Sequence, residues 1–187
     1  SLTLAASNSY TGLTAVNAGT LQVTGSVSAG SPVNVGASGT LTGNGALGSH
    51  LTVNGNVAPG TGGIGTLTVG GKLTLAGTAT MEIHKTSATC DKISGSSSTT
   101  FGGTLTVSNL AGTLAAGDKF ILFPSSAYTG AFTTINLPAL TGGLEWDTSG
   151  LLVDGSILVG FDAAITGHPS NQSVGQGVSA TFSVTAN

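Results

Sequence analysis

The chain has 187 residues, of which 39% are hydrophobic and only 6% charged, and its formal net charge is −3. It has four lysines and no arginine, too few cations to replace the counterions along nucleic acid phosphates, so we expect no nucleic acid partner. Abundant apolar residues argue against intrinsic disorder, and apolar runs of only a few residues predict no membrane span.

The segment from Gly19 to Leu75 repeats one short phrase. It reads GTLQV at 19–23, GTLTG at 39–43, SHLTV at 49–53 and GTLTV at 65–69. An apolar residue alternates with a small polar one, which is typical of a strand with one buried face. The glycines and asparagines between the copies leave no room for an ordinary helix. We therefore predict a stack of short strands.

The spacing of the copies favours a parallel β-helix. Propeller blades would be longer and more regular. Asn44-Gly45 and Asn54-Gly55 are hairpin signals that keep a β-sandwich open as an alternative. In a β-helix, turns of roughly 20 residues would stack about 4.8 Å apart, with Leu and Val inside and Thr outside, and would give about seven or eight turns.

Further along, the pattern changes twice. Residues 110–160 carry most of the aromatic side chains, which suits a cap over the last turn of a solenoid. After Phe161 a His-Pro break precedes a new alternation, SATFSVTA at 179–186. We therefore divide the chain into a β-helix with its cap at 1–160 and a linker with an incomplete β segment at 161–187.

The sequence resembles the autotransporter-associated β-strand repeat of bacterial surface and secreted proteins. NSYTGLTAVNAGTLQV at 8–23, FGGTLTV at 101–107, YTGAFTTINLP at 128–138 and LEWDTSGLL at 144–152 carry the resemblance, which covers roughly residues 5–160. It implies an all-β, right-handed parallel β-helix, an extracellular or cell-surface location in a bacterium, and no fixed catalytic residues.

Two looser resemblances bear on function. ITGHPSNQSVGQGVSATFSVTA at 165–186 is similar to the opening of bacterial immunoglobulin-like domains that serve as spacers. The whole arrangement looks like the β-helical xylan-binding modules of carbohydrate-binding module family 89. These resemblances imply a multimodular secreted protein whose other domains are partners of this one.

The ionisable residues do not suggest catalysis. A glycosidase needs two carboxyl groups facing each other across the scissile bond. Glu145 and Asp147 can share one strand face, but we interpret them as a solvated pair beside the cap, and we expect no enzyme. A polysaccharide lyase or hydrolase is a third alternative. The lone Cys90 is expected to be a small buried apolar residue.

The histidines are scattered without zinc-ligand spacing, so we expect no cofactor. A structural calcium ion on loop oxygens stays open, because such sites leave little trace in a sequence.

Aromatic and polar side chains offer a carbohydrate site. Sugars stack their C–H faces on tyrosine and tryptophan rings, and flanking polar groups fix their orientation. The predicted stacking residues are Tyr128, Trp146 and Tyr10. The predicted hydrogen-bonding residues are Glu145, Asp147, His84 and Lys85.

Two functions compete. The first is a non-catalytic carbohydrate-binding module of a secreted enzyme that degrades plant polysaccharides, binding xylan or a related neutral β-glycan of the plant cell wall. The second is a structural stalk or passenger segment of a bacterial surface adhesin that binds no ligand.

Overall fold

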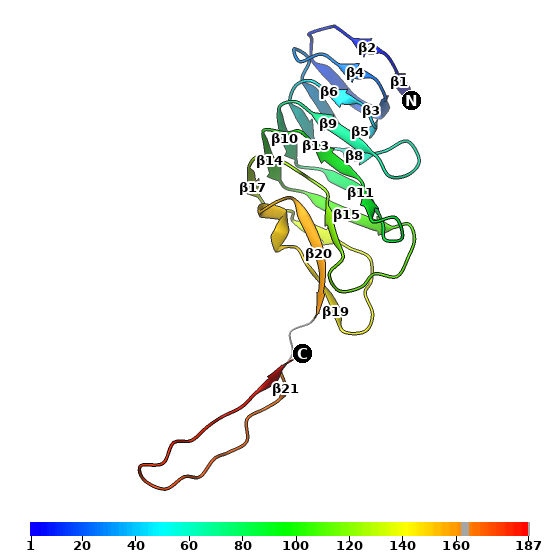
Figure 1. Ribbon diagram of the computed structural model, residues 1–187. Coiled ribbons are helices and arrows are strands. Elements are labelled where there is room, and N and C mark those ends of the chain that lie inside the picture. The colour runs from blue at the N-terminus through cyan, green and yellow to red at the C-terminus, as the bar shows by residue number, and fades with distance from the viewer. Residues whose placement is uncertain (162–164, 187) are drawn as a thin grey trace.

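The computed structural model describes residues 1–161 and 165–186. Short parallel strands wind into a β-solenoid of about five turns, so the predicted all-β parallel β-helix is confirmed (Figure 1). Successive turns place their strands on three faces around an apolar interior.

The first two faces belong to one sheet that bends along its length. β3 (Thr14–Val23) and β5 (Val33–Gly43) run across the bend, so the first part of β5 pairs with β7 and its later part with β8. The other strands of the first face are β7 (Leu51–Val53), β10 (Lys72–Leu75), β14 (Ser98–Phe101) and β17 (Tyr128–Gly130). The other strands of the second face are β1 (Leu2–Leu4), β8 (Asn56–Pro59), β11 (Thr78–His84), β15 (Thr104–Asn109) and β18 (Thr134–Asn136).

The third face is a separate parallel sheet. Its strands are β2 (Ser7–Asn8), β4 (Ser26–Val27), β6 (Ala46–Leu47), β9 (Thr66–Val69) and β13 (Lys92–Ser94). A short strand, β12 (Thr89–Cys90), folds back antiparallel on the end of β11.

Alternation along each strand places one set of side chains inside and the other outside. On the second face Leu21, Leu41, Val57, Ala79 and Leu105 pair in register from turn to turn, and each is at most 4% exposed. This column is the ladder that the repeated phrase predicts. Burial of its apolar surface is the main force that holds successive turns together.

The corner between the first and second faces depends on glycine. A Cβ added to Gly77 would overlap the backbone oxygen of Gly55, one turn below. Only a residue without a side chain allows the turns to approach this closely at the corner.

The predicted C-terminal cap is an antiparallel sheet. It consists of β16 (Lys119–Ile121), β20 (Ser156–Phe161) and β19 (Leu144–Asp147), with a short 3-10 helix, η1 (Ser149–Leu152), before β20. Phe123 is fully buried and lies edge-to-face against Phe101, with 5.3 Å between ring centroids. Phe132 packs against both rings, so aromatic side chains close the interior at this end.

The predicted number of turns is wrong. Leu2 pairs with Leu21 in the first turn, whereas Leu105 pairs with Ile135 in the last one, so later turns use more residues. The loops that follow β11 and β15 lengthen these turns. About five turns result, in place of seven or eight.

Residues after the cap form a separate hairpin. β21 (Ile165–Gly167) pairs antiparallel with β22 (Thr185–Ala186), and the segment extends away from the solenoid (Figure 1). The predicted linker and incomplete β segment begin at residue 161, and their residues 162–164 and 187 lie outside the described part of the chain. Among the described residues, no helix is long and apolar enough to cross a membrane.

Candidate functional site

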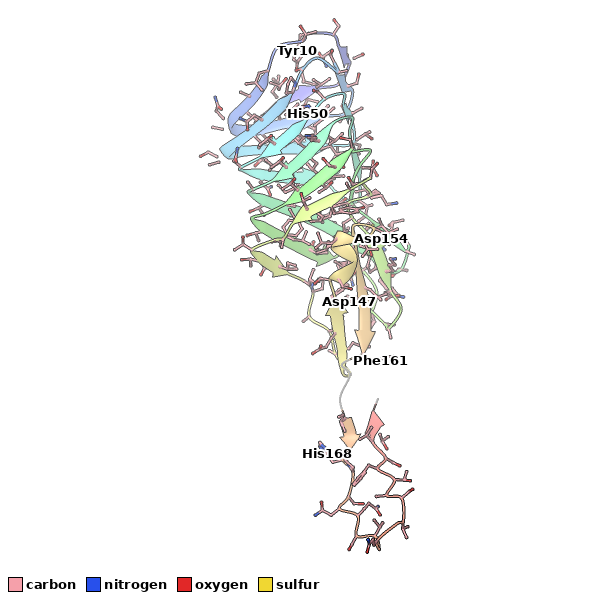
Figure 2. All side chains as sticks on the ribbon, turned by 90° about the vertical axis from the view of Figure 1, so that its left-hand side faces the viewer. Tyr10, His50, Asp147, Asp154, Phe161 and His168 are labelled. Atoms are coloured by element: carbon pink, nitrogen blue, oxygen red, sulfur yellow. The ribbon has the colours of Figure 1, made fainter. Side chains whose placement is uncertain are left out.

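The seven residues predicted to bind carbohydrate do not form one site. Tyr10 lies between β2 and β3 at the N-terminal end of the solenoid, whereas Asp147 lies in the cap at the other end (Figure 2). Tyr10 is 41% exposed, and its hydroxyl hydrogen-bonds to Thr14 Oγ1 at 2.9 Å. A single sugar chain would have to follow the whole solenoid to contact both ends.

Tyr128 on β17 is engaged in packing. Its ring stacks on Phe101 with an interplanar angle of 13° and 6.0 Å between centroids. Its hydroxyl donates to the backbone oxygen of Phe123 at 3.0 Å and accepts from the backbone N–H of Ser125 at 3.0 Å. The ring and the hydroxyl therefore both hold the chain around the last turn.

Trp146 on β19 is also partly buried against the core, and its indole N–H donates to the Pro138 oxygen at 2.8 Å. Glu145 and Asp147 flank it on the exposed side of the same strand. Hydrogen bonds from the Ser149 side chain and backbone lower the pKa of Asp147, which is therefore ionised at neutral pH. The two carboxylates lie together, as their spacing predicts, but on the side of the strand opposite to the indole.

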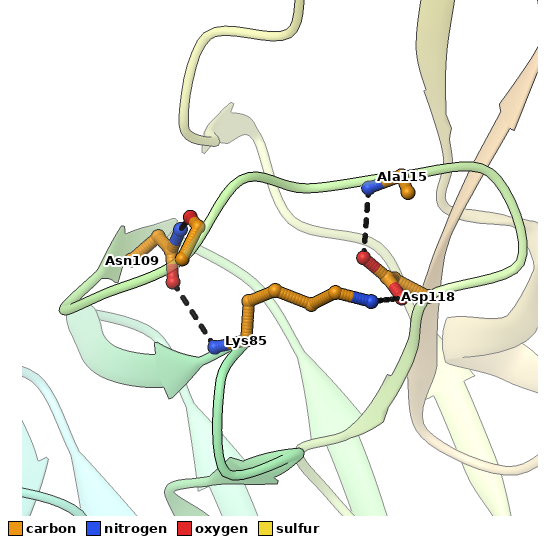
Figure 3. A network of polar contacts seen from close by, with 5 residues as sticks. Lys85, Asn109, Ala115 and Asp118 are labelled. Carbon is orange, nitrogen blue, oxygen red and sulfur yellow. Dashed lines mark hydrogen bonds and ion pairs between the residues drawn. The ribbon is translucent and has the colours of Figure 1, made fainter.

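Lys85 connects two loops of successive turns (Figure 3). Its ammonium forms an ion pair with Asp118, and the other carboxylate oxygen of Asp118 accepts from the Ala115 backbone N–H at 2.8 Å. Burial raises the pKa of Asp118, but the bonds from Lys85 and Ala115 outweigh it, so the pKa lies below the ordinary value. The Lys85 backbone N–H donates to Asn109 Oδ1 at 3.3 Å. These contacts make Lys85 a tether between loops.

His84 lies at the end of β11, just before this tether. Its Nδ1 accepts a hydrogen bond from the Ser87 backbone N–H at 3.2 Å, which holds the tight turn that follows the strand.

Asp91 is a buried carboxylate whose role the sequence does not reveal. It is 1% exposed, and its two oxygens accept from the backbone N–H of Gly65 at 2.7 Å and of Glu82 at 2.8 Å. Burial raises its pKa to about 6, although both hydrogen bonds act in the opposite direction. Asp91 thereby joins three segments that are distant in the sequence. Its neighbour Cys90 is buried, which raises the pKa of its thiol.

A shallow groove of about 340 Å³ lies at the corner where the first face turns into the second. Glycines form its floor. Its polar side chains are Ser38, Thr40, Asn54, Asn56 and Thr78, and none of the residues that line it is charged. The signal for this groove in the sequence is the threonine or asparagine that precedes the buried apolar residue in each repeat. The repeated phrase predicts that these threonines lie on the outer surface of the solenoid, but it does not indicate a groove.

The described residues contain no cluster of metal-ligating side chains. Within 1–161 and 165–186, no three His, Cys, Asp or Glu side chains are grouped so that they could hold a metal ion.

Residues 1–23 match the model of the family described as passenger-associated-transport-repeat. Together with the solenoid, this match supports an autotransporter-type β-helix repeat, of the kind associated with passenger domains. No curated protein matches the chain. The match says nothing of a carbohydrate-binding module or an immunoglobulin-like domain, and both resemblances stay predictions.

Proposed function

We propose that this chain is a non-catalytic solenoid segment of a bacterial surface or secreted protein, and that it acts as a rigid scaffold. The observation that carries the proposal is the ladder of parallel pairings that continues from β1 to β18 around a buried apolar interior. The passenger-type repeat at its N-terminal end supports the bacterial surface or the secreted fraction as its location.

The use of charged residues supports a scaffold. Lys85 is paired with Asp118, and Lys119 is paired with Asp154 at 2.6 Å, so these lysines and carboxylates join neighbouring segments. The buried carboxylate of Asp91 is held by two backbone N–H groups. Charges used in this way serve the fold, which is why we propose no catalytic role for them.

A second candidate function is the binding of a neutral polysaccharide. The observation that favours it is the uncharged groove at the corner of the solenoid, because hydroxyl and amide side chains suit the hydroxyl groups of sugars. In this proposal the chain is a carbohydrate-binding module for xylan or a related plant β-glycan. The tail would then be an immunoglobulin-like spacer to other domains of a multimodular secreted enzyme.

Affinity gel electrophoresis distinguishes the two candidates. The protein is run through native gels that contain xylan, mixed-linkage β-glucan, mannan or pectin, and through a gel without polymer. Unchanged mobility in every gel is the result expected of a scaffold without a ligand. Retardation by one polymer whose chain length stays constant would establish the binding module and contradict the ligand-free stalk.

A further inference from the structure

We propose that an extended, uncharged polysaccharide chain binds along the corner groove, parallel to the solenoid axis, with about one sugar on each turn. This inference rests on the second candidate function above. It assigns the site to the threonine and asparagine column of the second face, in place of the aromatic residues of the two ends.

The column repeats once on every turn. Thr20, Thr40, Asn56, Thr78 and Thr104 pair in register through β3, β5, β8, β11 and β15. Neighbouring members are therefore one strand spacing apart, about 4.8 Å. One pyranose unit of an extended β-linked glycan has nearly this length, so successive sugars would meet equivalent side chains.

The groups in the column are available to a ligand. Within residues 1–161 and 165–186, the hydroxyls of Thr40 and Thr78 have no hydrogen-bond partner, and both side chains are only half-buried. Asn56 is held in place because its Oδ1 accepts from Thr80 Oγ1 at 2.9 Å. Its amide nitrogen has no partner in the same part of the chain. The column therefore presents two free hydroxyl groups and one amide group that is held in place.

Shape and charge select the occupant. Gly39, Gly55 and Gly77 are among the lining residues and contribute no side chains to the groove, and a Cβ at any of them would overlap backbone atoms of a neighbouring segment. A lining without charge gives an anionic polymer no cationic partner for its carboxylates. A neutral chain can exchange part of its hydration for hydrogen bonds to the hydroxyl and amide groups of the groove.

The test compares matched valine variants in the same gels. Thr40→Val with Thr78→Val removes two groove hydroxyls and keeps the β-branched shape. Thr66→Val with Thr68→Val makes the same change on β9 of the third face. Thr40→Ser with Thr78→Ser retains the hydroxyls. Circular dichroism and thermal unfolding show whether each variant folds like the parent chain.

We expect the groove valine variant to bind the retarding polymer about tenfold more weakly, since two hydrogen bonds are lost. The β9 variant and the serine variant should be retarded like the parent. Parent-like retardation of the groove valine variant would overturn the assignment of the site while leaving polysaccharide binding intact. A parent chain that no polymer retards would overturn polysaccharide binding itself. Stronger retardation by pectin than by neutral polymers would contradict the uncharged occupant.

Discussion

Replacing Asp91 with asparagine should destabilise the solenoid by an amount that depends on pH. The Asp91 carboxyl group accepts one hydrogen bond on each oxygen, from the backbone N–H groups of Gly65 and of Glu82. Asparagine retains one acceptor and turns an N–H group toward the other backbone N–H. A buried donor left without an acceptor costs about 1–3 kcal/mol, and this is the expected loss of unfolding free energy at about pH 4.

The pH dependence comes from the raised pKa of Asp91. Burial raises this pKa from 3.8 to about 6, so the folded state favours the protonated carboxyl. The contribution of Asp91 to the free energy of unfolding is therefore fully present below pH 3.8 and is lost as the pH rises through about 6. A shift of about two pKa units, at about 1.36 kcal/mol each, corresponds to a loss of about 3 kcal/mol of unfolding free energy in the parent protein. The asparagine variant has no such loss, so its deficit should shrink toward neutral pH.

Urea unfolding of both proteins at several pH values between about 4 and 7.5, followed by circular dichroism, measures this difference. The difference between the two proteins removes the contributions of all other titrating groups. A deficit that stays constant over this range would refute the raised pKa. A deficit that grows with pH would show that the two backbone hydrogen bonds stabilise the ionised form more than burial disfavours it.

Three further substitutions test the packing. Leu73→Ala removes a fully buried ladder residue and should lower the unfolding free energy in urea by about 2–5 kcal/mol, and a change below about 1 kcal/mol would contradict close packing between turns. Gly77→Ala sets a methyl group against the Gly55 oxygen and should cost about 1–3 kcal/mol, so an unchanged thermal midpoint would refute the close approach at this corner. Lys119→Met breaks an exposed ion pair with Asp154 and should change stability by less than about 1 kcal/mol at moderate salt, whereas a larger loss would show that the pair is not screened.

The ladder is predictable from the sequence because it depends on local alternation. Leu21 and Leu41 occupy equivalent positions in copies of one phrase, and the structure pairs them. The number of turns is not predictable in this way. Ala79 pairs with Leu105 one turn further on, and this turn is lengthened by the loop after β11 that carries β12. No repeat marks how many residues such a loop adds.

The surroundings of the candidate residues depend on contacts between turns. The sequence shows Asp91 beside Cys90, but its hydrogen bonds come from Gly65 and Glu82, which only the winding of the chain brings together. An aromatic residue in a strand pattern is equally consistent with an exposed platform or a packed ring. Tyr128 is packed because the chain around Phe123 folds under it, which alternation alone does not show.

Removing one complete turn tests the stacked-turn architecture most directly. Deletion of residues 57–78 joins Asn56 to Ala79, which then occupies the interior position of its ladder partner Val57. Deletion of residues 57–79 instead places Thr80 at that position and moves every residue of β11 to the opposite side of the strand.

We predict that the first deletion variant keeps the β-sheet circular dichroism spectrum and unfolds cooperatively in urea. The second should lose cooperative unfolding, because polar side chains enter the interior. Equal behaviour of the two variants, or loss of the β-sheet spectrum in the first, would contradict a scaffold built from stacked, equivalent turns.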